Sequence, residues 1–300
     1  MKLLLLGKNG QVGWELQRSL APLGEVVALD FDSPGPLMAD FSQPEQLAAT
    51  VRAVAPDIIV NAAAHTAVDR CETEPDLARA INAAGPAVLA REAAARGAWL
   101  VHYSTDYVFD GSGSTPWRED DATGPLNVYG QTKLEGEAAI RASGCKHLIL
   151  RTSWVYSARG GNFAKTMLKL AQERESLKVI DDQIGAPTGA DLLADVTAHA
   201  LRAAIGNAGL GGTYHAVASG ETSWHGYACR AIEFARRFGK GVRVAPDAID
   251  AVPSSAFITA AKRPHNSRLD SNKLMAAFGL SLPPWELGVQ RMLAELLESN

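Results

Sequence analysis

The chain has 300 residues, of which 47% are hydrophobic and 21% charged, so it can fill a core, and disorder as its main state is excluded. Its 29 Lys and Arg against 33 Asp and Glu give a net charge of −4, which excludes a globally basic nucleic-acid binder but allows a local cationic pocket for an anionic small molecule. The length corresponds to about two domains or one large α/β unit.

Membrane and secretory classes also fit the sequence poorly. No apolar run approaches the ~20 residues of a spanning helix, and the leucines at 3–6 are too few for a signal peptide. Cys71, Cys145 and Cys229 are scattered without metal-ligand spacing, which indicates free thiols in a reducing compartment. We therefore expect a cytoplasmic protein with neither a membrane nor a nucleic acid as partner.

The first half of the chain alternates short apolar runs with helical patterns. Strands are predicted over 2–6, 25–30, 57–61, 98–104 and 147–151, and helices over 11–21, 43–54, 75–96 and 127–142. Strands that alternate with helices predict βαβ units, right-handed crossovers and a parallel sheet.

The second half is less regular, and the stretch 239–266 is rich in loops. Strands are predicted over 177–181 and 212–217, and helices over 162–175, 190–205, 223–238 and 285–297. The expected fold class is α/β, with a doubly wound, Rossmann-type parallel sheet and a second, smaller α/β substrate-binding cap. We expect a dinucleotide-binding domain over residues 1–155. Residues 156–300 are expected to be mainly cap, with a segment near 177–220 returning to the main sheet.

A glycine-rich turn follows the first predicted strand and opens the first helix. Its residues are Gly7, Lys8, Asn9, Gly10, Gln11, Val12 and Gly13. Glycines here allow a tight turn and let backbone N–H groups approach a diphosphate at the positive helix N-terminus. Asp30 ends the second strand, where a carboxylate can accept ribose hydroxyls. Asp30 favours NADH, whereas Lys8 could offset a 2′-phosphate, so the choice between NADPH and NADH stays open.

Two further segments fit the same cofactor groove. Asp40 and Phe41 follow the second predicted unit and could meet the edge and face of an adenine. The third strand ends in small residues, and Ala63, Ala64 and His65 are the candidate cofactor contacts there. Small residues at a strand end can equally be packing alone.

A tyrosine and a lysine share one face of the helix predicted over 127–142. Tyr129 and Lys133 are four residues apart, and a fixed ammonium beside a phenol is expected to lower the phenol pKa. Such a tyrosine can act as the general acid for a carbonyl oxygen that has received a hydride. Thr105 ends the fourth strand and could donate to the same oxygen, with Ser104 as its rival.

These motifs together resemble the extended short-chain dehydrogenase/reductases that act on nucleotide sugars. The glycine turn, the Ser-Thr-Asp strand end at 104–106 and the Tyr-x-x-x-Lys helix are shared with that family. Within it, the chain is similar to the group that reduces dTDP-4-dehydrorhamnose, and this similarity runs from residue 1 to about 295. The motifs that carry it lie at 61–69, 104–109, 151–156, 182–188 and 263–269.

The resemblance implies a reaction and its residues. NADPH or NADH would deliver hydride to the C4 ketone of a dTDP-sugar, giving dTDP-L-rhamnose, with Tyr129 as proton donor. Lys133 would tune the tyrosine and hold the nicotinamide ribose, and Thr105 would orient the carbonyl. The implied substrate contacts are Asp106, Trp154, Arg263 and Arg268.

Some relatives form dimers around Mg²⁺ held by carboxylates. The resemblance places that site at Glu15, Asp191 and Glu295, and carboxylate oxygens suit the ion. Asp191 stands where glutamate is expected and reaches one methylene less. A Mg²⁺-containing homodimer is therefore a further hypothesis.

Three alternative functions compete with this reductase. A 4,6-dehydratase needs a glutamate after Thr-Asp to act as base, and Tyr107 occupies that position. An epimerase would use the same Tyr/Lys pair but retain its cofactor. A non-catalytic, NAD(P)-binding regulatory protein would have little need for Thr105, Tyr129 and Lys133 together.

Overall fold

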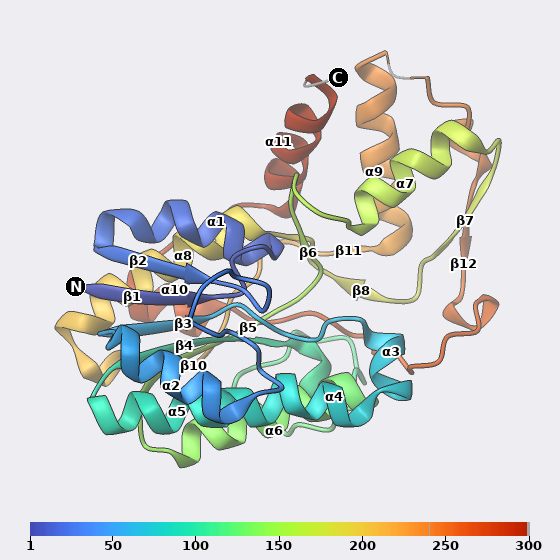
Figure 1. The fold of residues 1–300 in the computed structure, drawn as a ribbon. Coiled ribbons are helices and arrows are strands. Elements are labelled where there is room, and N and C mark those ends of the chain that lie inside the picture. The colour runs from blue at the N-terminus through green and yellow to red at the C-terminus, as the bar shows by residue number, and fades with distance from the viewer. Residues whose placement is uncertain (240, 299–300) are drawn as a thin grey trace.

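The computed structural model describes residues 1–239 and 241–298. Residue 240 of the predicted loop-rich stretch and residues 299 and 300 of the predicted cap lie outside the described residues. A six-stranded parallel sheet forms the centre, in the order β10-β5-β4-β3-β1-β2 (Figure 1). Its strands are β1 (Lys2–Leu6), β2 (Glu25–Leu29), β3 (Ile58–Asn61), β4 (Trp99–Thr105), β5 (Lys146–Thr152) and β10 (Gly212–His215).

Helices cover both faces of this sheet. Figure 1 shows one layer of helices above the sheet and another below it. The upper layer contains α1 (Gln11–Leu20), α8 (Ala190–Gly206) and α10 (Asn272–Phe278). The lower layer contains α2 (Pro44–Val54), α4 (Pro75–Arg79), α5 (Gly85–Arg96) and α6 (Val128–Ala142). Every residue of β3 and β4 is buried, as expected for parallel strands covered on both faces. The predicted doubly wound α/β class is confirmed.

The rest of the chain forms a smaller layer beside the carboxyl ends of the strands (Figure 1). Its helices are α7 (Phe163–Glu173), α9 (Trp224–Arg237) and α11 (Trp285–Glu298), which pack through buried aromatic and aliphatic side chains. Its short strands form three pairs. They are β7 (Leu177–Ile180) with β12 (Ile249–Val252), β8 (Ile184–Gly185) with β11 (Thr222–Ser223), and β6 (Val155–Tyr156) with β9 (Thr188–Gly189).

Several predicted elements differ in detail from the structure. The predicted 75–96 helix contains a wide π-helical turn, Ala80–Ala84. Within this turn the Asn82 side chain bonds the backbone of His65 and the hydroxyl of Thr132. The predicted strand at 177–181 pairs within the smaller layer, whereas β10 joins the main sheet. The helices α3 (Val68–Thr73) and α10 were not predicted, since each is too short to show periodicity. None of the described helices is both long and apolar enough to cross a membrane.

Candidate active site

A cavity of about 420 Å³ opens at the carboxyl ends of β1, β3, β4 and β5, with Trp224 of α9 in its wall. Ligands of doubly wound sheets bind at this edge. Of the predicted site residues, it brings together Gly10, Gln11, Val12, Ala64, Thr105, Asp106, Tyr129, Lys133 and Trp154. Gln11 Oε1 and Thr152 Oγ1 are buried there without a hydrogen-bond partner among the described residues. Because unpaired buried polar atoms are costly, the wall suits a polar ligand.

The glycine turn is packed so tightly that no side chain fits at Gly7 or Gly13. Gly7 has φ +85°, and a Cβ on it would lie 2.7 Å from the backbone nitrogen of Ala63. A Cβ on Gly13 would lie 1.9 Å from the carbonyl oxygen of Gly7. The first turn of α1 therefore sits against the end of β1, with Gly10 at its N-cap and on the cavity wall. This leaves open, positively polarised backbone at the position where a diphosphate would bind.

We expect Gly13→Ala to destabilise the fold by about 3 kcal/mol, because backbone rather than a flexible side chain must move to admit the methyl group. Gly161→Ala is the matched control, since a Cβ there meets nothing within 4 Å. Urea unfolding of both variants measures the difference in the free energy of unfolding. Equal stability of the two variants would contradict the close approach.

The other predicted cofactor residues lie around the turn. The Asp30 carboxylate accepts hydrogen bonds from the backbone N–H groups of Asn9 and Phe31, both at 2.9 Å, and so ties the turn to the end of β2. Asp40 accepts from Ser42, and Phe41 is buried against the core. The remaining cofactor residues outside the cavity lining are Gly7, Gly13, Ala63 and His65. Their contacts with a dinucleotide stay predictions.

Tyr129 and the end of β4 form the reactive corner of the cavity. Burial raises the pKa of Tyr129, and a hydrogen bond with Thr105 partly opposes this. Burial also raises the pKa of Asp106 to about 7, against the hydroxyls of Ser267 and Thr105. Thr105 Oγ1 donates to Asp106 Oδ1 at 3.1 Å. The corner therefore holds a protonated phenol next to a carboxyl group that titrates near neutral pH.

Lys133 does not act on Tyr129 as the sequence predicted. Its Nζ donates to the carbonyl oxygen of Tyr103 at 2.6 Å and lies 3.2 Å from Nε2 of His102. Lys133 is not among the charges that shift the pKa of Tyr129. The expected lowering of the phenol pKa is wrong, because the lysine is turned toward β4. Burial lowers the pKa of Lys133 itself to about 8.

Two tryptophans form the apolar wall of the cavity. The rings of Trp154 and Trp224 are stacked, with centroids 3.7 Å apart and planes 16° apart. Trp154 has φ +48°, a left-handed conformation that is rare for a bulky residue and is associated with functional sites. A Cβ on Gly185 would lie 2.8 Å from the Trp154 ring, so β8 also packs closely against it.

The two predicted phosphate-binding arginines lie outside the cavity lining and are engaged in ion pairs. Arg263 Nη2 lies 2.6 Å from Oδ2 of Asp69, and Arg263 Nε is buried with no partner among the described residues. Arg268 forms a forked pair with Glu221, at 2.7 and 3.2 Å. Their binding to a substrate diphosphate stays a prediction.

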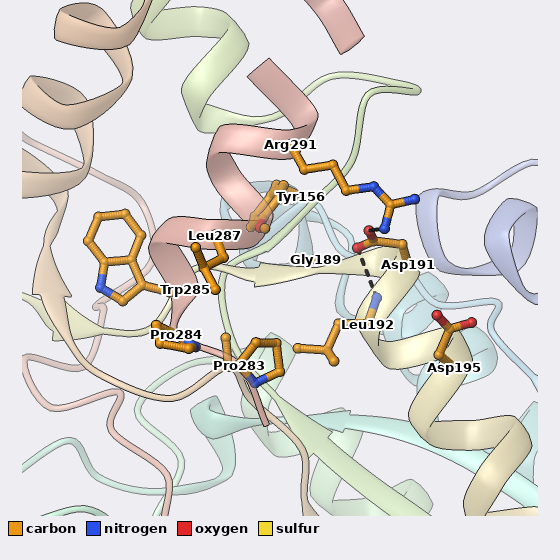
Figure 2. Close-up of a pocket in the computed structure, with 12 residues that line it drawn as sticks. Tyr156, Gly189, Asp191, Leu192, Asp195, Pro283, Pro284, Trp285, Leu287 and Arg291 are labelled. Atoms are coloured by element: carbon orange, nitrogen blue, oxygen red, sulfur yellow. Dashed lines mark hydrogen bonds and ion pairs between the residues drawn. The ribbon is translucent and has the colours of Figure 1, made fainter. Parts of the chain in front are cut away.

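The three predicted magnesium ligands come close together but show no ligating cluster. Burial raises the pKa of Glu15, and the charges of Asp191 and Glu295 add to that rise. Figure 2 shows Arg291 reaching toward Asp191, at 3.5 Å, on the wall of a second cavity. Arg18 lies 3.7 Å from Glu15. The described residues contain no group of three or more side chains that could hold a metal ion. The Mg²⁺ hypothesis is therefore not supported, since arginines already neutralise two of these carboxylates.

Comparisons with known proteins agree with this geometry. The pattern of the RmlD substrate binding domain family matches residues 1–298. The chain belongs to this family. It is 58% identical to a dTDP-4-dehydrorhamnose reductase of Escherichia coli K12, over 100% of the chain and 99% of that protein.

Solved structures of dTDP-4-dehydrorhamnose reductases are also similar. One from Clostridium acetobutylicum has a TM-score of 0.89 and 36% identity, covering 99% of both chains. One from Bacillus anthracis, solved in complex with NADP, has a TM-score of 0.87 and 35% identity, covering 98% of this chain and 99% of that one. The chain is thus an oxidoreductase of the RmlD family.

Several residues around the cavity of this RmlD-family chain were not predicted from the sequence. Trp224 lies far from Trp154 in sequence, and a helical tryptophan on its own is typical of a core. Tyr103 and His102 lie inside an apolar strand, a position that is typical of residues that pack in the core. For His102 the available signal was its polarity in a strand otherwise suited to burial.

Proposed function

We propose that the chain reduces the C4 ketone of dTDP-4-dehydrorhamnose to dTDP-L-rhamnose, using NADPH or NADH. The observation that carries this proposal is the convergence of the glycine turn, Thr105, Tyr129 and Lys133 on one cavity. It is supported by 58% identity over the full chain to a protein named for this activity.

The residues present fit a nicotinamide dinucleotide. The turn at 7–13 leaves no room for a side chain at Gly7 or Gly13 and offers the positive end of α1 to a diphosphate. Gln11 Oε1 and Thr152 Oγ1 lie in the wall as polar groups with no hydrogen-bond partner in the part of the chain that the structure describes. When bound, the dinucleotide supplies the hydride. Since Asp30 already receives two backbone N–H groups, its carboxylate is held in place to meet the adenosine ribose.

Three side chains, at the end of β4 and on α6, would act on the sugar, two of them on its C4 carbonyl. Burial keeps Tyr129 protonated, so the phenol can donate its proton to the oxygen at C4 as negative charge develops there. The Thr105 hydroxyl, next to the phenol, orients the same oxygen. Asp106 keeps Oδ2 free of hydrogen-bond partners among the described residues, and this oxygen can hold a sugar hydroxyl.

The nucleotide-sugar would lie across both layers of the molecule. Its deoxysugar fits the apolar wall of Trp154 and Trp224, because a flat ring offers dispersion contact to a sugar face. Its diphosphate is assigned to Arg263 and Arg268, whose guanidinium groups suit phosphate oxygens. This arrangement corresponds to a dinucleotide-binding domain over residues 1–155 and a substrate-binding cap over most of 156–300. A cytoplasmic homodimer completes the proposal, and size-exclusion chromatography tests its oligomeric part.

The purified chain tests the function directly. Absorbance of the reduced nicotinamide is followed with dTDP-4-dehydrorhamnose and either NADPH or NADH. We expect oxidation of the dinucleotide only when the sugar nucleotide is present, and the faster donor identifies the preferred cofactor. No oxidation with either donor overturns the proposal. Interconversion of two nucleotide sugars by protein that carries its own NAD would instead identify an epimerase. Dinucleotide binding without turnover would identify a regulatory protein.

A further inference from the structure

A buried series of hydrogen-bonding groups runs behind the cavity, from the end of β3 across β4 to α6. Asn61 and His102 are cross-strand partners in the sheet, and each is 1% exposed. Nδ2 of Asn61 lies 3.0 Å from Nδ1 of His102. Nε2 of His102 lies 3.2 Å from Nζ of Lys133. The series therefore ends on the lysine of the proposed active site.

The orientation of the Asn61 amide is set by the backbone. The N–H group of Ala63 donates to Oδ1 of Asn61 at 3.0 Å, and a backbone N–H can only donate. The NH₂ group of Asn61 must then face the ring of His102. Because an amide NH₂ can also only donate, Nδ1 of His102 is the acceptor and carries no hydrogen.

The remaining ring nitrogen must carry the hydrogen of His102. Burial lowers the pKa of His102 well below 6.5, so the ring is neutral at neutral pH. A neutral imidazole has one N–H, which here is Nε2–H and points toward Nζ of Lys133. That contact is a hydrogen bond only when Nζ offers a lone pair.

We propose that His102, oriented by Asn61, is a positioning residue that admits Lys133 to this buried position only as a neutral amine. The amine also donates to the carbonyl oxygen of Tyr103. A proton on Nζ turns the contact with Nε2–H repulsive, and the ammonium then turns toward the cavity and the phenol of Tyr129. This deepens the proposed function and rests on it, since it explains how Lys133 reaches the tyrosine.

Few other charges bear on this arrangement. Burial lowers the pKa of Lys133 to about 8, and the charge of Glu137, one helical turn along α6, opposes the shift. Glu137 is itself paired with the buried Arg151 of β5, at 2.7 Å. Among the described residues, the charged group that acts on the pKa of His102 is Lys133 in its ammonium form. The amine and the ammonium are therefore both populated near neutral pH.

Ring-nitrogen NMR of the cofactor-free protein tests the hydrogen position. The nitrogens of ¹⁵N-labelled His102, assigned by the signals that His102→Phe removes, are followed from pH 6 to 9. We expect a bare Nδ1 and a protonated Nε2 throughout, with Nε2 shifting as Lys133 titrates. The Lys133→Met variant should lose that shift. A protonated Nδ1, or a doubly protonated ring near neutral pH, overturns the proposal.

The variant Asn61→Asp reverses the hydrogen-bond direction without changing side-chain size. A carboxylate accepts from Nδ1, so Nε2 becomes bare and can accept from the ammonium of Lys133. We expect the proton affinity of Lys133 to rise roughly tenfold or more, read from the same NMR titration. The double variant Asn61→Asp/His102→Phe keeps the new charge without the ring. In this double variant the titration of Lys133 is followed by the side-chain ¹⁵N signal of the lysine itself. We expect most of the rise in the proton affinity of Lys133 to be lost. A rise of equal size would assign the effect to charge alone and overturn the proposal.

Both experiments use neither substrate nor dinucleotide. An inactive chain with the expected His102 hydrogen position would therefore refute the proposed function and leave the Lys133 arrangement standing. An active chain in which Nδ1 of His102 carries the hydrogen would support the proposed function and refute the Lys133 arrangement. If the substituted chains fail to fold, the wild-type spectrum, assigned through Asn61-coupled resonances, still decides the hydrogen position.

Discussion

Tyr129→Phe is expected to lower kcat by a factor on the order of 10² or more while leaving the affinity for the dinucleotide nearly unchanged. The phenol is the proton donor of the proposed reaction, and phenylalanine keeps its ring in the edge-to-face contact with Tyr107, at 5.6 Å between centroids. Steady-state kinetics with the sugar nucleotide measure kcat. Quenching of protein fluorescence on titration with NADPH measures the cofactor affinity.

Tyr107→Phe serves as the comparison, because Tyr107 lines the same cavity and burial raises its pKa in the same way. Its hydroxyl is not assigned to the sugar carbonyl, so the loss in kcat should stay under about tenfold. Similar losses in the two variants would attribute the effect to a general disturbance of the cavity. Near-wild-type turnover of Tyr129→Phe would remove the phenol from the mechanism.

The alternation of strands and helices that builds the main sheet was predictable because its signals are local. The leucines of β1, the glycine turn and the stripe on α1 each depend on neighbours within a few residues. Strand alternation then restricts the topology to parallel crossovers. The cap was harder. The strand at 177–181 was predicted, but its partner β12 lies some 70 residues later and is too short to show a period. Pairings of that kind depend on tertiary packing, which leaves no local pattern.

The residues of the candidate site were predictable where their signals are local, as for the main sheet. Tyr129, Lys133 and Thr105 carry recognisable spacing, and all three line the cavity. The direction in which Lys133 points was not predictable, because helical spacing places two Cβ atoms on one face but does not say which polar group a long side chain will reach. Here the carbonyl of Tyr103 and the ring of His102 compete with the phenol. Distant partners, such as Trp224 and Trp154, also require the fold.

Replacing Lys133 by methionine is expected to change how stability depends on pH. The buried lysine has a pKa of about 8 in the folded protein, against 10.5 for the ordinary side chain. The unfolded chain thus binds this proton more tightly. The resulting destabilisation, about 3 kcal/mol, is fully present below pH 8 and is lost as pH rises from 8 to 10.5. The advantage of Lys133→Met over wild type should therefore shrink by about that amount across this window.

Urea unfolding at intervals from pH 7 to 11 measures this difference. Lys169→Met on α7 is the matched control, because that side chain is 74% exposed and meets water in both states, so its difference from wild type should stay flat. If the difference in unfolding free energy between Lys133→Met and wild type is also independent of pH, Lys133 is not buried away from water. Since the same variant should also lose most turnover, a gain in stability with a loss of activity would identify Lys133 as a residue whose burial serves catalysis at the expense of the fold.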